Sequence, residues 1–114
     1  MPFISVKTTH NLTEEQKVAL KAGIGQVVSD LPNKSEKVLM VDIDDGHTMF
    51  MGGEKQESCA FVDVRMYGAA PFAAKKQFTE DMFRVLSDSI GVSEDKAFLA
   101  IAQYDTWGTK GSIK

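Results

Sequence analysis

The sequence predicts an α+β fold (α/β two-layer), in which a duplicated β-strand, helix, β-strand unit forms a four-stranded mixed sheet with two helices on one face. Three observations lead to this prediction. The chain has 114 residues, the usual size of one domain. A shift of 58 residues pairs residues 3–46 with 61–104 without a gap and with nine identities, about three times the number expected from average residue usage. Each copy reads strand, helix, strand. We therefore expect a single domain over residues 1–114 that contains this internal repeat.

The first copy opens with residues 3–8, whose polar and apolar side chains alternate as in a strand. A helix is expected next, because Thr13 and Gln16 have the spacing of a capping box. Apolar residues then recur at helical intervals on one face, and these are Leu20, Ile24, Val27, Val28 and Leu31. Residues 39–43 alternate again and close the unit. A strand, a crossover helix and a strand within about 40 residues form a parallel pair.

The second copy follows the same plan. Residues 60–67 are strand-like, and Pro71 suits the first turn of a helix. The apolar face of that helix is formed by Phe78, Met82, Val85 and Leu86, and residues 97–101 give the last strand. Residues 48–51 are expected to add a short edge strand, and the tail after Tyr104 to form an arm that closes against a neighbour. Because two helices cover only one face of the sheet, the other face predicts a homo-oligomer.

Composition excludes several classes of protein. The net charge of −3 gives no reason to expect nucleic acid as a partner. No apolar run is long enough to cross a membrane, and the first ten residues do not resemble a signal peptide. Cys59 is the only cysteine, and His10 and His47 show no metal-ligand spacing, so neither a disulfide nor a metal is expected. We expect a cytoplasmic protein.

Pro2 is the candidate functional residue that chemistry singles out. If Met1 is removed, Pro2 carries a free secondary amine, which can act as a general base. Burial and a nearby cation would lower the pKa of that amine toward neutral pH. The alternative is that Pro2 only begins an edge strand, where its missing amide hydrogen does no harm.

The chain resembles the tautomerase superfamily, and within it the macrophage migration inhibitory factor group. The resemblance is carried by the opening MPFISVKTT, by MFMGGEKQESCAF from Met49, by VDVRMYG, by VSEDKAFLAIAQYD and by the Trp-Gly tail. LTEEQK also resembles the first-helix start of the 4-oxalocrotonate tautomerases. The resemblance implies the tautomerase fold, with three subunits whose sheets pack into a trimeric barrel and whose helices lie outside.

The resemblance also implies a function. Members of the family interconvert the keto and enol forms of small 2-keto acids such as phenylpyruvate, without a cofactor, and use the N-terminal proline as the base. That role falls on Pro2 here. The family's carboxylate-binding lysine falls on Lys34, and its carboxylate-binding backbone amide falls on Tyr67, before Gly68. A solvated loop lysine is the competing interpretation of Lys34. The resemblance thus implies an isomerase.

Several positions depart from the family pattern. The tyrosine and asparagine that an adjacent subunit contributes to the pocket correspond to Phe98 and Ala100, and neither can donate a proton. The proton donor is therefore Tyr67, Tyr104 or a water molecule. Leu12 stands where the 4-oxalocrotonate tautomerases have a carboxylate-binding arginine, which argues against a dicarboxylate substrate. We interpret Arg65, the repeat counterpart of Lys7, as a solvent or interface residue rather than an anion ligand.

The sequence also fits two other functions. One is a binding or signalling module that keeps the fold and has only vestigial tautomerase activity. The other is a different proline-dependent reaction, such as hydration of an unsaturated acid. Phenylpyruvate turnover, before and after replacement of Pro2, separates the first of these from the enzyme.

Overall fold

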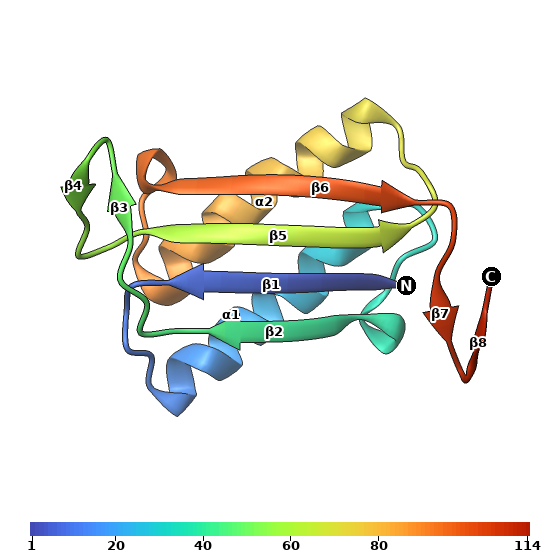
Figure 1. Cartoon of the computed structure of the whole chain (residues 1–114), viewed down its shortest axis with the longest axis horizontal. Coiled ribbons are helices and arrows are strands. Elements are labelled where there is room, and N and C mark those ends of the chain that lie inside the picture. The colour runs from blue at the N-terminus through green and yellow to red at the C-terminus, as the bar shows by residue number, and fades with distance from the viewer.

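The central sheet confirms the predicted α+β architecture. The computed structural model describes residues 1–114, and its four main strands are β1 (Pro2–Thr8), β2 (Met40–Asp44), β5 (Ala60–Tyr67) and β6 (Ala97–Tyr104). They lie in the order β2-β1-β5-β6. β1 runs parallel to β2, β5 runs parallel to β6, and β1 and β5 are antiparallel. The sheet is therefore mixed, with each strand, helix, strand unit contributing one parallel pair (Figure 1).

Two α-helices begin and end where local chemistry predicts. The helix α1 (Glu14–Val27) is capped by Thr13, whose side chain accepts a hydrogen bond from the Gln16 amide at 3.1 Å. Gln16 Oε1 in turn accepts from the Thr13 amide at 3.0 Å, which completes the capping box. The helix α2 (Phe72–Ile90) follows Pro71 and ends at Gly91, whose φ of 70° is left-handed and favours glycine. Short 3-10 helices are η1 (Val28–Asp30), η2 (Glu36–Val38) and η3 (Glu94–Lys96).

The hydrophobic core lies between the sheet and the two helices, which cover the same face of the sheet (Figure 1). On the helical side the fully buried residues include Leu20, Ile24, Val28, Leu31, Phe78, Met82 and Leu86. They pack against Ile4, Val6, Val62, Val64 and Met66 of the two central strands. The helical periodicity read from the sequence therefore identifies the core-facing stripe, while Val27 and Val85 lie at its margin. Neither α-helix combines the length and the apolar surface that a membrane crossing requires.

The opposite face of the sheet has no covering element within the chain. Side chains alternate along a strand, so the residues between the core positions point to this open face. Met40 is 66% exposed and Phe98 is 60% exposed. Large apolar side chains left in water on one sheet face are typical of a surface that another chain covers.

Two small hairpins extend from opposite ends of the sheet (Figure 1). The strand β3 (Phe50–Met51) pairs with β4 (Glu54–Lys55), and not with the main sheet. The expected edge strand over residues 48–51 is therefore wrong: the turn at Gly52 and Gly53, both with positive φ, folds the segment back on itself. At the other end, β7 (Gly108–Thr109) pairs with β8 (Ser112–Ile113), so that the tail is itself a hairpin.

Asp30 and Asp81 form a carboxyl pair between η1 and α2. The hydrogen bond with Asp81, then burial and charge repulsion, raise the pKa of Asp30 to about 6. Hydrogen bonds with Asp30, Arg84 and Gln77 lower the pKa of Asp81. One Asp30 carboxyl oxygen is buried without a partner. The folded protein therefore retains a proton that the unfolded chain releases near pH 4.

Replacement of Asp30 by Asn should stabilise the protein at neutral pH, because the amide donates a hydrogen bond without needing that proton. A raised carboxyl pKa contributes stability that is complete below pH 4 and lost as the pH rises through about 6. We expect Asp30→Asn to raise the free energy of unfolding at pH 7 by about 1 kcal/mol, a value reduced by solvent screening, and to give no gain at pH 4. Urea unfolding at both pH values measures this. Asp88→Asn, the exposed repeat counterpart, is the control, and an equal gain at both pH values would contradict the prediction.

Candidate active site

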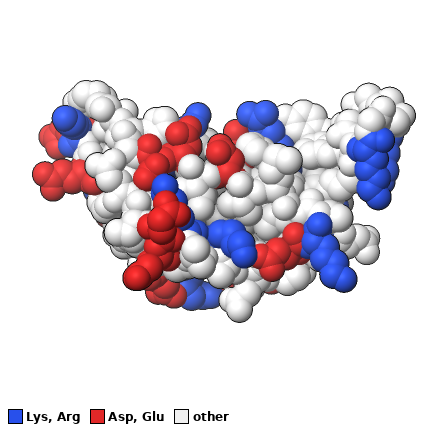
Figure 2. Space-filling view, turned by 90° about the horizontal axis from the view of Figure 1, so that it is seen from below, with Lys and Arg blue, Asp and Glu red and all other residues white.

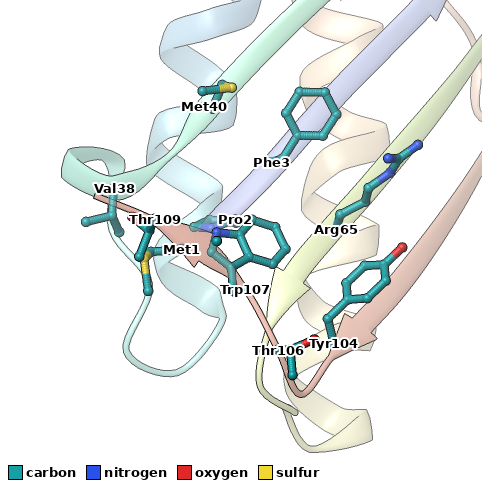
Figure 3. A pocket seen from close by; sticks show the side chains of 11 residues that line it. Met1, Pro2, Phe3, Val38, Met40, Arg65, Tyr104, Thr106, Trp107 and Thr109 are labelled. Carbon is teal, nitrogen blue, oxygen red and sulfur yellow. The ribbon is translucent and has the colours of Figure 1, made fainter. Parts of the chain in front are cut away.

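A cavity of about 630 Å³ lies at the end of the sheet where β1 begins and where β5 and β6 end. Its walls come from four separate parts of the chain (Figure 3). These parts are the chain start with Pro2 and Phe3, residues 38–40 between η2 and β2, Arg65 of β5, and the continuous stretch 104–109 from the end of β6 into the tail. The cavity therefore joins both repeat units and the C-terminal hairpin.

Pro2 lies buried at the start of β1, opposite Met66 of β5. The strand ladder fixes the position of the ring, and the missing amide hydrogen leaves no donor unsatisfied at that point. Burial, followed by the charges of Lys34 and then Lys114, lowers the pKa of the neighbouring Met1 amine below its ordinary value. The surroundings of the chain start thus disfavour a protonated amine.

Lys34 and Tyr67 lie together beside this chain start. Lys34 Nζ donates a hydrogen bond to the Tyr67 carbonyl oxygen at 3.2 Å. The Tyr67 amide donates to the Met1 carbonyl oxygen at 3.4 Å. The structure therefore brings together three residues that are far apart in sequence and that the family resemblance singles out, namely Pro2, Lys34 and Tyr67.

Lysine side chains also set the charge of this end of the molecule. Figure 2 shows only basic side chains at the end that carries the C-terminal hairpin, on the right, while the acidic side chains lie over the left and the middle of this face, among further basic ones. Lys114 Nζ lies 5.9 Å from the centre of the Tyr67 ring. An anionic ligand would therefore meet an attractive potential at the cavity end of the protein.

Tyr104 and Trp107 form an aromatic wall of the cavity. Their ring centroids are 6.1 Å apart with an interplanar angle of 56°. The Gly68 amide donates to the Tyr104 carbonyl oxygen at 2.7 Å, which ties the end of β6 to the turn after β5. Tyr104 thus presents a phenol group to the cavity, whereas the Tyr67 side chain is not part of the lining.

Arg65 also lines the cavity, although the sequence suggested a solvent or interface position. Its guanidinium carbon lies 5.8 Å from the centre of the Phe3 ring, and one of its nitrogens donates to Asp63 Oδ2 at 3.1 Å. The Asp63 hydrogen bond and charge raise the pKa of Arg65 further above its already high value. The available signal is that Arg65 lies near the end of β5, two residues before Tyr67, which the family resemblance assigns to the site.

Phe98 does not approach Pro2 within one subunit. It pairs with Phe61 in the register of β5 and β6, six residues before Tyr104 and roughly 20 Å along the strand from the cavity. Its place in a pocket formed with an adjacent subunit stays a prediction. No group of three or more His, Cys, Asp or Glu side chains is arranged to hold a metal ion.

The duplicated strand, helix, strand fold with a buried proline at the cavity end defines a protein of the tautomerase superfamily. The family described as macrophage migration inhibitory factor (MIF) matches residues 1–113. The chain therefore belongs to the macrophage migration inhibitory factor family, as the resemblance predicts.

Solved structures of other proteins share the fold. MIF2 of Leishmania major has a TM-score of 0.91 and 18% identity, with 100% of this chain and 97% of that chain covered. The macrophage migration inhibitory factor of Toxoplasma gondii has a TM-score of 0.89 and 18% identity, with 98% of this chain and 99% of that chain covered. Pt0534, described as inactivated by 2-oxo-3-pentynoate, has a TM-score of 0.86 and 13% identity, with 96% and 93% covered. No curated protein sequence matches the chain. At such identities, these likenesses show the fold alone.

Proposed function

We propose that the protein is a cofactor-independent keto–enol tautomerase of small 2-keto acids such as phenylpyruvate. The observation that carries the proposal is the group of residues at the start of β1. There a buried proline lies next to a lysine and a backbone amide, and the adjacent amine has a lowered pKa. A base, a cation and a fixed donor are what an enolisation requires.

In the proposed reaction, the Pro2 nitrogen is free because Met1 has been removed. It accepts a proton from C3 of the keto acid, and the electron pair of that bond forms the C2–C3 double bond of the enol. The carbonyl oxygen then receives a proton from a donor, and protonated Pro2 returns a proton to that donor, so that both groups end in the state in which they began. Conversion of the enol to the ketone likewise begins with neutral Pro2, which accepts the enol hydroxyl proton through the donor and delivers a proton to C3. Tyr104 is the proposed proton donor, since its phenol lines the cavity. Lys34 and the Tyr67 amide hold the carboxylate while charge develops on oxygen.

Met1 supports this assignment, because it occupies the space that a substrate would need. Its carbonyl oxygen accepts the hydrogen bond from the Tyr67 amide, as a substrate carboxylate oxygen would. Removal of Met1 would therefore have two effects. It would convert the Pro2 nitrogen from an amide into a base, and it would free the Tyr67 amide to bind a substrate.

The relative inactivated by 2-oxo-3-pentynoate also supports the proposed substrate class. That compound is itself a 2-keto acid, and it acts on a protein with the same fold. We carry over only the class of compound, namely a small acid with a ketone next to the carboxylate. The cytoplasm remains the proposed location.

A homotrimer is part of the proposal. The open face of the sheet carries Met40 and Phe98, both more than half exposed in a single chain. Three sheets packed into a barrel would cover such faces and bring Phe98 of one subunit toward the cavity of the next. A trimer would therefore complete three active sites at the subunit junctions.

The test of the proposed function is the ketonisation of phenylenolpyruvate by the protein and by Pro2→Ala, followed by ultraviolet absorbance. Turnover that depends on Pro2 supports an enzyme. Absence of turnover in both proteins, each folded and with Met1 removed, would favour the binding or signalling module.

Replacement of Lys34 by Gln should change both the pH dependence and the affinity of the reaction. A nearby cation lowers the pKa of an amine, so its removal raises the pKa of the Pro2 base and moves the rise of kcat/KM to higher pH. Loss of a charged carboxylate ligand should also raise KM about tenfold. The measurement is the pH profile of phenylenolpyruvate turnover. Lys34→Arg keeps the charge and should retain the wild-type profile, whereas unchanged profiles for both variants would remove Lys34 from the site.

A further inference from the structure

Arg65 is the only side chain lining the cavity that carries a permanent charge. The other lining residues are apolar, aromatic, hydroxyl-bearing or glycine. An arginine on a cavity wall presents up to five N–H donors in one plane, which suits a carboxylate that binds through two oxygens. The mechanism proposed above assigns no task to this group.

Arg65 and Lys34 lie on opposite sides of Pro2 along the strand direction. Arg65 is in register with Phe3, and Pro2 is in register with Met66. Lys34 Nζ contacts the Tyr67 carbonyl oxygen, on the other side of Pro2. Residues 65 and 67 share one face of β5 and are roughly 7 Å apart. The reacting centre is therefore flanked by two cations, each within reach of one end of a small ligand.

The ion pair with Asp63 leaves most of the Arg65 donors unused. One guanidinium nitrogen donates to Asp63 at 3.1 Å, and the side chain is 53% exposed. The Phe3 ring, 5.8 Å from the guanidinium carbon, supports one face of the group. Figure 3 shows the Arg65 side chain and the Tyr104 ring on the same wall of the cavity. Asp63 thus holds the guanidinium in place and at the same time competes with a ligand for it.

Leu12 does not bear on this part of the substrate. It is 8% exposed and belongs to the hydrophobic core, and it does not line the cavity. The lack of an arginine at residue 12 therefore does not exclude a different cation in the site that binds a second carboxylate.

We propose that Arg65 binds a second anionic group of the substrate, and that the site prefers 2-keto acids with a further carboxylate at the far end. The 2-keto carboxylate binds at Lys34 and the Tyr67 amide, the reacting carbon lies at Pro2, and the distal carboxylate lies at Arg65. This inference rests on the proposed function for the position of the reacting carbon.

A matched pair of substrates tests the inference. 2-Oxoglutarate and 2-oxopentanoate have the same five-carbon chain and differ by a distal carboxylate in place of a methyl group. Exchange of the C3 hydrogens for deuterium, followed by proton NMR, reports enolisation of both. We expect kcat/KM to be about tenfold higher for 2-oxoglutarate, and Arg65→Gln to remove that preference through KM.

Three further variants sharpen the result. Arg65→Lys keeps the charge but not the planar fork, and should retain part of the preference. Asp63→Asn removes the competing carboxylate and should strengthen the preference, which is the opposite sign to Arg65→Gln. Arg84→Gln is the control, because Arg84 is an exposed arginine that is likewise paired with an aspartate, but it lies on α2, on the helical side of the molecule and outside the cavity. The ratio of the two substrates should not change in that variant.

The outcomes separate this inference from the proposed function. Equal activity on the two substrates, or an equal effect of Arg65→Gln on both, would overturn the role of Arg65 and leave the tautomerase intact. If neither substrate exchanges, the binding of the two acids decides whether Arg65 forms the subsite, and turnover of phenylenolpyruvate decides the proposed function. Fluorescence of Trp107, the only tryptophan and a cavity residue, reports that binding. Tighter binding of 2-oxoglutarate that depends on Arg65 would support the subsite, and its absence would overturn it.

Discussion

Replacement of Pro2 by alanine is expected to lower kcat on phenylenolpyruvate by about 100-fold, the lower end of the contribution that a positioned general base makes. Alanine at this position still allows removal of Met1 and leaves a primary amine. What is lost is the ring, which fixes φ and holds the nitrogen lone pair at the strand end. The free energy of unfolding should change little, because the substitution affects only the first residue of β1. The expected loss is therefore one of chemistry and not of folding.

Two controls identify the cause of that loss. Pro71→Ala changes another proline, at the start of α2 and outside the cavity, and should leave turnover unchanged. A preparation that retains Met1, verified by intact mass, should be as inactive as a protein without the base, since its Pro2 nitrogen is an amide. Turnover by the Met1-retaining protein at the wild-type rate would show that the base lies elsewhere, whereas wild-type turnover by Pro2→Ala would show that the proline ring is not needed.

The fold was accessible from the sequence because each local signal agreed with the repeat. The capping box at Thr13 and the helical stripe through Leu20 and Ile24 are local patterns, and both lie where they were expected. The segment around Phe50 was misassigned because two strand-like residues before a glycine turn fit either a sheet edge or a separate hairpin. Pairing partners of so short a strand are decided by tertiary structure and not by propensity.

The candidate site was accessible only in part. The chemistry of a terminal proline indicates Pro2, whereas Lys34 and Tyr67 are identified only through the family resemblance. Hydrogen bonds join Lys34 to Tyr67 and Tyr67 to Met1, next to Pro2. Arg65 was set aside because its repeat counterpart, Lys7, suggested a solvent position. The two are equivalent in the repeat, but β1 begins at the cavity whereas β5 ends there, so Arg65 lines the cavity and Lys7 lies toward the other end of the sheet. The repeat therefore predicts the shared fold, but it does not predict which of two equivalent residues lies at the cavity.

Substitution of Phe98 is expected to have the second large effect, and it tests whether the site needs more than one subunit. In a single chain this side chain is 60% exposed on the open sheet face and lies far from the cavity. The chain therefore does not need Phe98 for its own core. If three sheets pack together, however, the same side chain becomes buried at a subunit junction, where a carboxylate without a partner would cost several kcal/mol.

Phe98→Glu is therefore expected to convert a trimer into a folded monomer and to lower turnover of phenylenolpyruvate about 100-fold, in line with the loss of a positioned site wall. Light scattering during gel filtration measures the mass, and circular dichroism shows whether the monomer keeps its fold. Val18→Glu places the same charge at an exposed apolar residue of α1, on the helical side of the molecule, and should leave both the trimer and its activity unchanged. A trimeric and fully active Phe98→Glu protein would mean that the open sheet face is not the interface and that one subunit holds the whole site. A monomer with full activity would show that the open sheet face is the interface but that the active site does not need a second subunit. Pro2 would remain the base, and every required residue would lie within a single chain.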